Sequence, residues 1–152
     1  MSSNEMDNRA KSFLVYIAGP LYTSSQRQYL EQIDTICQRM GLSTYLPHRD
    51  AGLAKSCDVK GIFEKDLNAL KSSDLVIAVL DGPIADDGTS WEMGYAYALG
   101  IPIIGIVEDF RVRDPQLDIN LMIASTCKIV TSLQKLEEEL QTFIRHKNLQ
   151  YP

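Results

Sequence analysis

The 152-residue chain lacks several features that would assign it to particular protein classes. Its three cysteines, Cys37, Cys57 and Cys127, are far apart and form neither a CxxC motif nor a Cys/His ligand pattern. Its two histidines, His48 and His146, have no metal-like partners in the sequence, so we expect no metal site and no cofactor. An odd number of cysteines without a disulfide framework is typical of a reducing compartment, and we expect a cytoplasmic protein.

Long apolar runs and an excess of positive charge are also missing. No stretch approaches the roughly 20 apolar residues that cross a bilayer, and residues 1–11 are polar rather than signal-like. The formal net charge is −5 and the basic residues are scattered, whereas nucleic-acid-binding proteins usually carry a basic stripe. We therefore expect neither a membrane nor a nucleic-acid polymer as a partner.

Short apolar runs alternate with amphipathic segments of helical length along the chain. The pattern predicts strands at 13–18, 42–46, 75–80, 101–107 and 128–131, and helices at 26–40, 59–71, 89–99, 117–124 and 133–147. Strands that are apolar on both faces and alternate with helices indicate a parallel sheet covered on both sides. We expect a disordered tail at 1–11 and one α/β domain at 12–152. Its fold would be a single five-stranded parallel sheet sandwiched by helices, flavodoxin-like or Rossmann-like.

Ligands of such sheets bind beyond the carboxyl ends of the strands, near the point where the strand order reverses. Four segments follow predicted strands and carry polar residues: 19–22, 47–50, 81–92 and the loop after Val107. We expect these segments to surround one crevice.

The segment from Asp86 to Gly94, DDGTSWEMG, contains the most informative group of residues. One interpretation is a capping box, in which Thr89 is the N-cap of a helix and Glu92 reaches back to it. The other is a functional carboxylate, because the dipole at a helix N-terminus favours the ionised form of Glu92. An ionised carboxylate facing a crevice can act as the nucleophile of a glycosyl-transferring enzyme. The local sequence leaves both interpretations open.

Four motifs in order make the chain resemble the nucleoside 2-deoxyribosyltransferase family: VYIAGP at 15–20, DL at 66–67, DDGTSWEMG at 86–94 and NLMIA at 120–124. The likeness extends from about residue 13 to residue 145, and the third motif is its specific part. The resemblance implies an enzyme of nucleotide salvage that exchanges the bases of 2′-deoxynucleosides through a covalent deoxyribosyl intermediate, with hydrolysis as a side reaction. It also implies deoxynucleosides and free nucleobases as partners, and a homo-oligomer built from dimers, such as a hexamer.

The resemblance assigns three catalytic roles. Glu92 matches the family's nucleophile, Asp66 matches the carboxylate that protonates the departing base, and Tyr16 matches an aromatic residue that orients the nucleophile. The reaction needs such an acid because a nucleobase leaves poorly as an anion. Two carboxylates in one site push one pKa up, so we expect Asp66 to hold the proton while Glu92 stays charged.

The resemblance also suggests a substrate-binding set. Asp86 and Asn120 match positions that hold the hydroxyls of the deoxyribose, and glycine at 19 lets the backbone approach the substrate closely. The sequence at 47–50, PHRD, departs from the family pattern, which has a neutral base-binding residue there, so base preference stays open. A basic side chain in this loop can also recruit a phosphate. Tyr151 is a candidate for reaching a neighbouring subunit's site. The predicted substrate-binding residues are Gly19, Pro47, Arg49, Asp86, Asn120 and Met122.

Two alternative functions compete with base exchange. A related hydrolase, the 2′-deoxynucleoside 5′-monophosphate N-glycosidase, shares the fold and the nucleophile but has small hydroxyl residues at positions 86 and 120. Asp86 would repel a dianionic phosphate, which favours free nucleosides. A non-catalytic nucleotide-sensing module is the other alternative, since this layered fold also serves signalling. Such a module would not need Glu92 and Asp66 to face one crevice.

Overall fold

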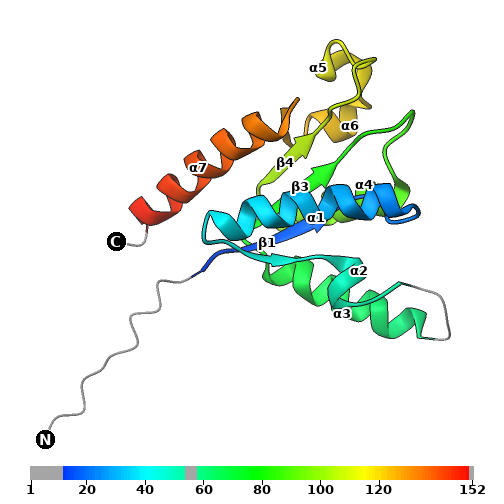
Figure 1. Ribbon diagram of the computed structural model, residues 1–152, viewed down its shortest axis with the longest axis vertical. Helices are drawn as coiled ribbons and strands as arrows, with labels where there is room; N and C mark the ends of the chain where they lie inside the picture. Colours follow the sequence, from blue (N-terminus) through cyan, green and yellow to red (C-terminus); the bar gives the residue numbers. More distant parts are fainter. Residues whose placement is uncertain (1–11, 54–57, 151–152) are drawn as a thin grey trace, which may run out of the picture.

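The computed structural model describes residues 12–53 and 58–150; the predicted tail at 1–11 and Tyr151 lie outside this part of the chain. Strands and helices alternate along it (Figure 1). The strands are β1 (Leu14–Ala18), β2 (Ser43–Tyr45), β3 (Leu75–Val79), β4 (Ile103–Ile106) and β5 (Lys128–Val130). The helices are α1 (Ser24–Arg39), α2 (Pro47–Asp50), α3 (Val59–Ser72), α4 (Asp87–Ala98), α5 (Pro115–Asp118), α6 (Leu121–Ala124) and α7 (Leu133–Gln150).

The five strands form one sheet in the order β2-β1-β3-β4-β5, and each neighbouring pair is parallel. This order is that of a flavodoxin-like doubly wound sheet, in which the chain reverses direction across the sheet next to β1 and β3. All five residues of β3 are buried, as expected for a central strand that is covered on both faces. The predicted single five-stranded parallel sheet is therefore confirmed.

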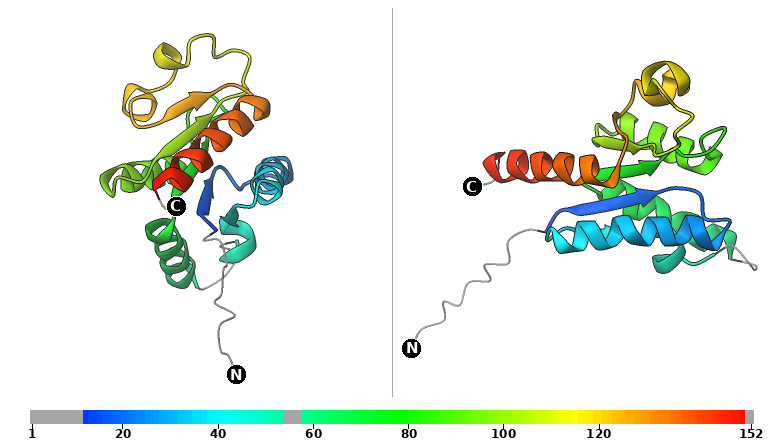
Figure 2. Two further views of the ribbon diagram at one scale, coloured as in Figure 1. Left: turned by 90° about the vertical axis from the view of Figure 1, so that its left-hand side faces the viewer. Right: turned by 45° about the horizontal axis from the view of Figure 1, so that its top comes forward.

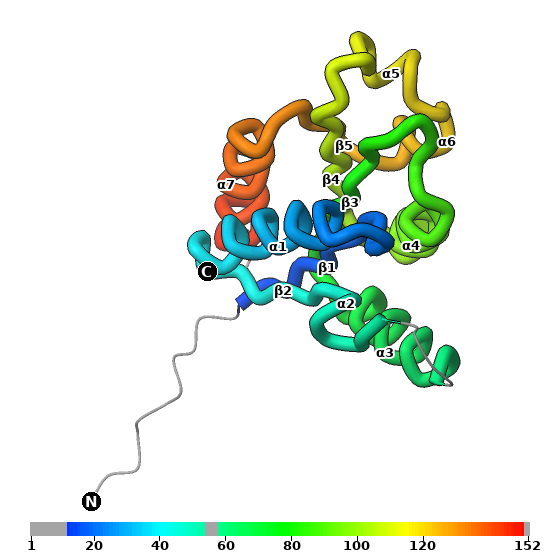
Figure 3. The backbone as a smooth tube through the Cα atoms, turned by 45° about the vertical axis from the view of Figure 1, so that its right-hand side comes forward, coloured from blue at the N-terminus to red at the C-terminus, as the bar shows by residue number. Residues whose placement is uncertain are grey.

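Two apolar layers cover the two faces of the sheet. Successive strand residues point to opposite faces, so Val15 and Ile17 of β1 pack with α1 and α7, whereas Tyr16 and Ala18 pack with α3 and α4. Figure 2 shows the resulting three layers, and in Figure 3 α7 and α3 lie on opposite sides of the strands. The carboxylates of Asp66 and Glu92 lie on the face of the sheet that carries Tyr16.

A close contact at Gly19 fixes the connection from β1 to α1. A Cβ atom at this position would lie 2.7 Å from Leu30 Cδ2 and 3.2 Å from Val79 Cβ. Glycine therefore allows α1 to pack tightly against the carboxyl end of the sheet. The helix itself begins with a capping box, in which the Thr23 side chain accepts from the Gln26 amide at 3.2 Å and the Gln26 side chain accepts from the Thr23 amide at 2.9 Å.

The start of α4 differs from the prediction. The N-cap is Asp86, whose Oδ2 accepts from the backbone amide and from the hydroxyl of Thr89, each at 2.9 Å. The interpretation of Thr89 and Glu92 as a capping box is therefore wrong. Because the helix begins three residues earlier than Thr89 would place it, Glu92 lies in the second turn and its carboxylate takes part in other contacts.

Two other segments also differ from their predictions. The predicted loop at 47–50 is the short helix α2, and the predicted helix at 117–124 is split into α5 and α6. The split has a local cause, because two side chains each begin a new helix: Asp114 accepts from the Gln116 amide at 3.0 Å and Asn120 accepts from the Met122 amide at 2.9 Å. Within residues 12–53 and 58–150, no helix is both long and apolar enough to cross a membrane.

Candidate active site

Two carboxylates from different helices meet beside the carboxyl ends of β1 and β3. Asp66 comes from α3 and Glu92 from α4, and both line a cavity of about 580 Å³, here called the carboxylate cavity. Gly19, Pro47 and Asp86 line the same cavity. The structure thus brings together five of the predicted site residues: four come from three of the four segments expected around one crevice, and Asp66 comes from α3.

Glu92 is anchored to the centre of the sheet. Its Oε1 accepts a hydrogen bond from the hydroxyl of Tyr16, a fully buried residue of β1, at 2.6 Å. Burial raises the pKa of Glu92 to about 7; the Tyr16 hydrogen bond opposes this rise, while the charges of Asp66 and Asp86 add to it. We expected the raised pKa at Asp66 and a charged Glu92; burial raises the pKa of Glu92 as well, because its carboxyl is withdrawn from solvent.

Asp66 has its own tyrosine partner, which was not among the predicted site residues. The hydroxyl of Tyr45 donates to Asp66 Oδ1 at 2.8 Å. Burial raises the pKa of Asp66, and this hydrogen bond opposes the rise. Tyr45 ends β2 opposite Tyr16 of β1, and the two rings stack with centroids 5.4 Å apart and planes at 19°. Tyr45 lies within the strand predicted at 42–46, but only the register between the strands shows that it meets Tyr16.

A smaller apolar cavity of about 350 Å³ shares the two carboxylates. Its walls include Tyr16 and two half-exposed aromatic rings, Phe63 and Trp91, which meet edge to face at 6.1 Å. Asp66 and Glu92 line it as well, so the carboxylates lie between this aromatic cavity and the carboxylate cavity. Flat apolar walls next to two carboxyl groups suit a ring-shaped ligand that also carries polar atoms.

Asp86 combines a structural role with a place in the carboxylate cavity. Besides capping α4, it lies near the exposed Tyr22, whose pKa is raised mainly by the charge of Asp86. Tyr22 and Arg27 also line this cavity, and Arg27 Nη1 donates to the Leu21 carbonyl at 2.7 Å. The described lining thus carries the carboxylates of Asp66, Asp86 and Glu92 against one guanidinium, so its charge is acidic.

Arg49 is held away from the carboxylate cavity by two other carboxylates. Its Nη1 donates to both oxygens of Asp34 at 3.1 Å, and its Nη2 donates to Asp50 Oδ2 at 2.7 Å. Paired guanidinium–carboxylate contacts of this kind are strong and directional. The structure places Pro47 at the carboxylate cavity but does not place Arg49 among its described lining residues.

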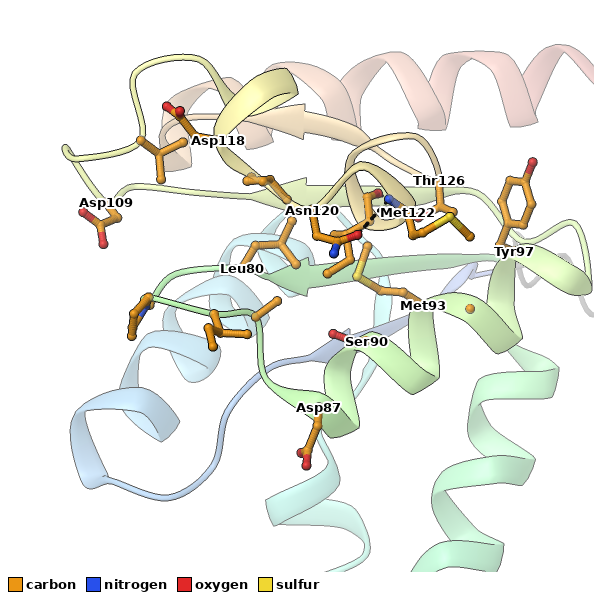
Figure 4. A pocket seen from close by; sticks show the side chains of 18 of the residues that line it. Leu80, Asp87, Ser90, Met93, Tyr97, Asp109, Asp118, Asn120, Met122 and Thr126 are labelled. Atoms are coloured by element: carbon orange, nitrogen blue, oxygen red, sulfur yellow. Dashed lines mark hydrogen bonds between the residues drawn. The ribbon is translucent and has the colours of Figure 1, made fainter.

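Asn120 and Met122 lie in a different part of the chain's surface. Both line a third cavity of about 1230 Å³, where Figure 4 shows them across from Ser90 and Met93 of α4. Positions 90 and 92 lie about 200° apart around the helix, so Ser90 and Glu92 face opposite sides. The loop after Val107 also borders this third cavity through Asp109 and Arg111. The prediction of one crevice for all four segments is therefore wrong within the single chain.

The residue types near these cavities bear on metal binding. Among the residues that the structure describes, no three His, Cys, Asp or Glu side chains are grouped so that they could hold a metal ion.

The fold and the site together define an α/β protein whose sheet edge presents two partly buried carboxyl groups, each hydrogen-bonded to a tyrosine. The sequence model of the family described as nucleoside 2-deoxyribosyltransferase matches residues 15–122, which is more than half of the chain. The chain belongs to the nucleoside 2-deoxyribosyltransferase family. Its family and structural neighbours indicate an enzyme of deoxyribosyltransferase type.

Solved structures support the same fold. A conserved protein from Enterococcus faecalis superposes with a TM-score of 0.71 at 28% identity, over 86% of this chain and 98% of that one. A 2-deoxyribosyltransferase from Bacillus psychrosaccharolyticus superposes with a TM-score of 0.69 at 21% identity, over 82% of this chain and 90% of that one. A CMP N-glycosidase from Clostridium botulinum superposes with a TM-score of 0.56 at 17% identity, over 86% of this chain and 98% of that one. Among curated protein sequences, none is significantly similar to this chain.

Proposed function

We propose that the protein transfers 2-deoxyribose between nucleobases, with free 2′-deoxynucleosides as donors and Glu92 as the covalent nucleophile. The observation that carries this proposal is the hydrogen bond from Tyr16 to Glu92 Oε1 in the cavity that also holds Asp66. The bond fixes one carboxylate oxygen and leaves Oε2 to attack. A sensing module would have no use for a second carboxyl group beside this one.

The first half of the reaction forms the glycosyl-enzyme. Glu92 Oε2 bonds to the anomeric carbon while the bond from that carbon to the base nitrogen breaks, and the electron pair of the broken bond goes to the base. Asp66 gives its proton to the base, so a neutral nucleobase leaves and Asp66 becomes ionised. Burial supports this role because it raises the pKa of Asp66.

The second half releases the sugar from Glu92. The nitrogen of an incoming base attacks the anomeric carbon, the ester bond to Glu92 breaks, and the proton of the incoming base passes to Asp66. Water in place of the base gives free deoxyribose, which is the hydrolytic side reaction. Two displacements at one carbon retain its configuration, so a β-nucleoside yields a β-nucleoside.

The charge of the carboxylate cavity supports free nucleosides over nucleotides. Among the described lining residues, Asp66, Asp86 and Glu92 face one cation, Arg27, which already donates to the Leu21 carbonyl. Two unit charges of like sign about 4 Å apart repel by roughly 4 kcal/mol at an effective dielectric constant near 20, before screening. Arg49 supports the same preference, because its guanidinium is bound by Asp34 and Asp50.

The decisive experiment incubates the enzyme with deoxyinosine and free adenine and separates the products by chromatography. Deoxyadenosine as a product supports transfer. Hypoxanthine and deoxyribose without deoxyadenosine would contradict transfer and indicate hydrolysis, and unchanged substrates would favour a sensing role. Denaturation during turnover, followed by peptide mass spectrometry, should find one deoxyribosyl group on the peptide that contains Glu92. A Glu92→Ala variant is the matched control and should carry no adduct.

The alternative function is hydrolysis of deoxynucleoside 5′-monophosphates. Two observations favour it: the fold similarity to a CMP N-glycosidase and the presence of Arg27 in the carboxylate cavity. The ratio of kcat/KM for deoxyadenosine to that for its 5′-monophosphate decides between the two functions. We expect the nucleoside to be preferred, and a preference for the monophosphate would promote the hydrolase.

We also propose that the protein is a homo-oligomer built from dimers and that Asn120 and Met122 serve a neighbouring copy's site. Both residues line the third cavity, and apolar side chains there are strongly exposed, with Ile84 at 85% and Met122 at 71%. Exposed apolar surface of this kind marks interaction sites. Mixing inactive Glu92→Ala with inactive Asn120→Ala should restore activity to on the order of a quarter, the share of intact shared sites in a randomly exchanged dimer. No recovery after proven subunit exchange would contradict a shared site.

A further inference from the structure

We propose that Tyr45 is a positioning residue that fixes which oxygen of Asp66 carries the catalytic proton. The inference rests on the proposed function, because it assigns Asp66 the role of the acid that protonates the base. It is drawn from three contacts in the core of the site: Tyr45 to Asp66, Tyr16 to Glu92, and the stack of the two tyrosine rings.

The backbone of the sheet determines where the Tyr45 hydroxyl lies. Tyr45 is the register partner of Tyr16, and parallel pairing places both rings on the same face of the sheet. The rings stack at 5.4 Å, which restricts the rotation of each side chain. Each hydroxyl then reaches a different helix, Tyr16 toward Glu92 on α4 and Tyr45 toward Asp66 on α3. The two carboxyl groups are thus held at a separation that the pairing of β1 with β2 sets.

The hydrogen bond from Tyr45 determines which oxygen of Asp66 carries the proton. Burial and the nearby Asp66 carboxyl raise the pKa of the Tyr45 phenol, so its hydroxyl remains a hydrogen-bond donor at neutral pH. A donor at Oδ1 requires that oxygen to accept, so the proton of a neutral Asp66 sits on Oδ2. After the proton has passed to the base, the same hydroxyl stabilises the carboxylate that is left. Tyr45 thereby favours transfer of the proton from Asp66 Oδ2 to the departing base.

The test compares wild type with Tyr45→Phe, which keeps the stacked ring and removes only the hydroxyl. With deoxyinosine as donor, kcat should fall roughly 10- to 100-fold, the worth of one hydrogen bond to a charged group. With a nitrophenyl deoxyriboside, whose leaving group needs no proton, the rate should change less than about 3-fold. KM should stay near its wild-type value, because Tyr45 acts through Asp66. Equal losses on both substrates would overturn the proposal.

A second readout does not depend on turnover. In protein labelled with ¹³C at its aspartate carboxyl carbons, the Asp66 signal is assigned by its loss in Asp66→Asn. Its titration midpoint should rise in Tyr45→Phe by about one pH unit or more, since the lost hydrogen bond favours the ionised form. An unchanged midpoint would refute the contact's role even in a protein without transferase activity. Failure of the proposed function and failure of this inference are thus separate results.

Two further variants guard against a merely structural effect. Tyr29→Phe is a matched control, because the Tyr29 hydroxyl also donates to a carboxylate, Glu108, at 2.9 Å, outside the carboxylate cavity. It should leave both the kcat and the Asp66 titration unchanged. In an Asp66→Asn background, Tyr45→Phe should cause little further loss, as expected for two residues that act as a unit. A full additional loss would show that Tyr45 acts through the fold rather than through Asp66.

Discussion

The Tyr16 hydroxyl and Glu92 Oε1 lie 2.6 Å apart although 76 positions separate the two residues in the chain. Tyr16 belongs to the fully buried part of β1, so the position of the Glu92 carboxylate is tied to the centre of the sheet rather than to a surface loop. Rigid support of this kind keeps a reacting group within the narrow geometry that catalysis requires. The same withdrawal from solvent raises the pKa of Glu92 to about 7.

The pH dependence of the covalent step should report the Glu92 carboxyl. With a nitrophenyl deoxyriboside, which needs no acid, kcat/KM should fall on the acidic side with a midpoint near pH 7, where the pKa of Glu92 lies. Only the ionised carboxylate attacks, so activity is lost as the pH falls through that pKa. Tyr16→Phe removes a bond that lowers the pKa and should move the midpoint to higher pH. A midpoint near 4.5, the ordinary glutamate value, would contradict the role of burial.

Glu92→Gln should make the protein more stable at pH 8 while abolishing transfer. In the folded state the pKa of Glu92 is about 7, against 4.5 in an exposed chain. The native state therefore binds more protons between these values, and the free energy of unfolding falls as the pH rises from 4.5 to 7. Glutamine mimics the neutral form, so at pH 8 the variant should gain about 1–3 kcal/mol, and at pH 4 the gain should vanish. Urea unfolding at both pH values measures this difference.

Asp66→Asn should slow base release selectively. The amide keeps the shape of the side chain but has no acidic proton to give, so the rate with deoxyinosine should fall on the order of 100-fold or more. A substrate with a nitrophenolate leaving group should be affected far less. Single-turnover kinetics on both substrates provide the comparison, and parallel losses would mean that Asp66 is not the acid.

The two roles of Asp86 should separate in a pair of variants. Asp86→Ala removes the N-cap of α4 and should cost about 0.5–2 kcal/mol of stability. Asp86→Ser keeps a capping oxygen and should leave the melting temperature close to that of wild type. The serine variant also removes one negative charge from the carboxylate cavity, so it should narrow the preference for deoxyadenosine over its 5′-monophosphate. An unchanged preference would show that Asp86 does not discriminate against phosphate.

The parallel sheet was predictable because its signal is strong and local. Apolar runs such as Leu75 to Val79 are too short for buried helices and have no polar face, so a central strand is the arrangement that suits them. The same alternation of strand and helix places Gly19, Asp86 and Glu92 at one edge of the sheet, where the structure finds them, whereas Asp66 was singled out by the family resemblance. Position along the chain was thus enough to gather most of the site.

The cap of α4 was not predictable from local sequence. Asp86 and Thr89 are both good N-cap residues, and a glutamate three positions after threonine completes a regular capping box. The outcome is decided by Tyr16, a distant residue that accommodates the Glu92 carboxylate, while Asp86 accepts both polar groups of Thr89. The choice between two similar local solutions therefore depends on tertiary contacts.

The direction of the Arg49 side chain and the role of Tyr45 were hidden for a related reason. Arg49 bonds to Asp34, which lies on α1 and is 15 positions away. Tyr45 meets its partners only once the register of β2 against β1 is fixed. Neither contact leaves a repeat or a motif in the sequence. In each case a single alternative rotamer or a shift of one residue would change the partner.

The parallel pairing that supports the site also has a consequence for how the molecule folds. The Glu92–Tyr16 and Asp66–Tyr45 contacts join residues of β1, β2, α3 and α4. Strand β1 is fixed in the sheet only when it pairs with β3, as Val15 does with Leu75. Pairings over such long stretches of chain form late, because the entropy of closing the loop is lost before the contacts are gained. No partly folded species that lacks the β1–β3 pairing can hold both carboxyl groups in place. In a refolding experiment, catalytic competence should therefore emerge together with the last cooperative phase, and it should trail the earlier gain of helix.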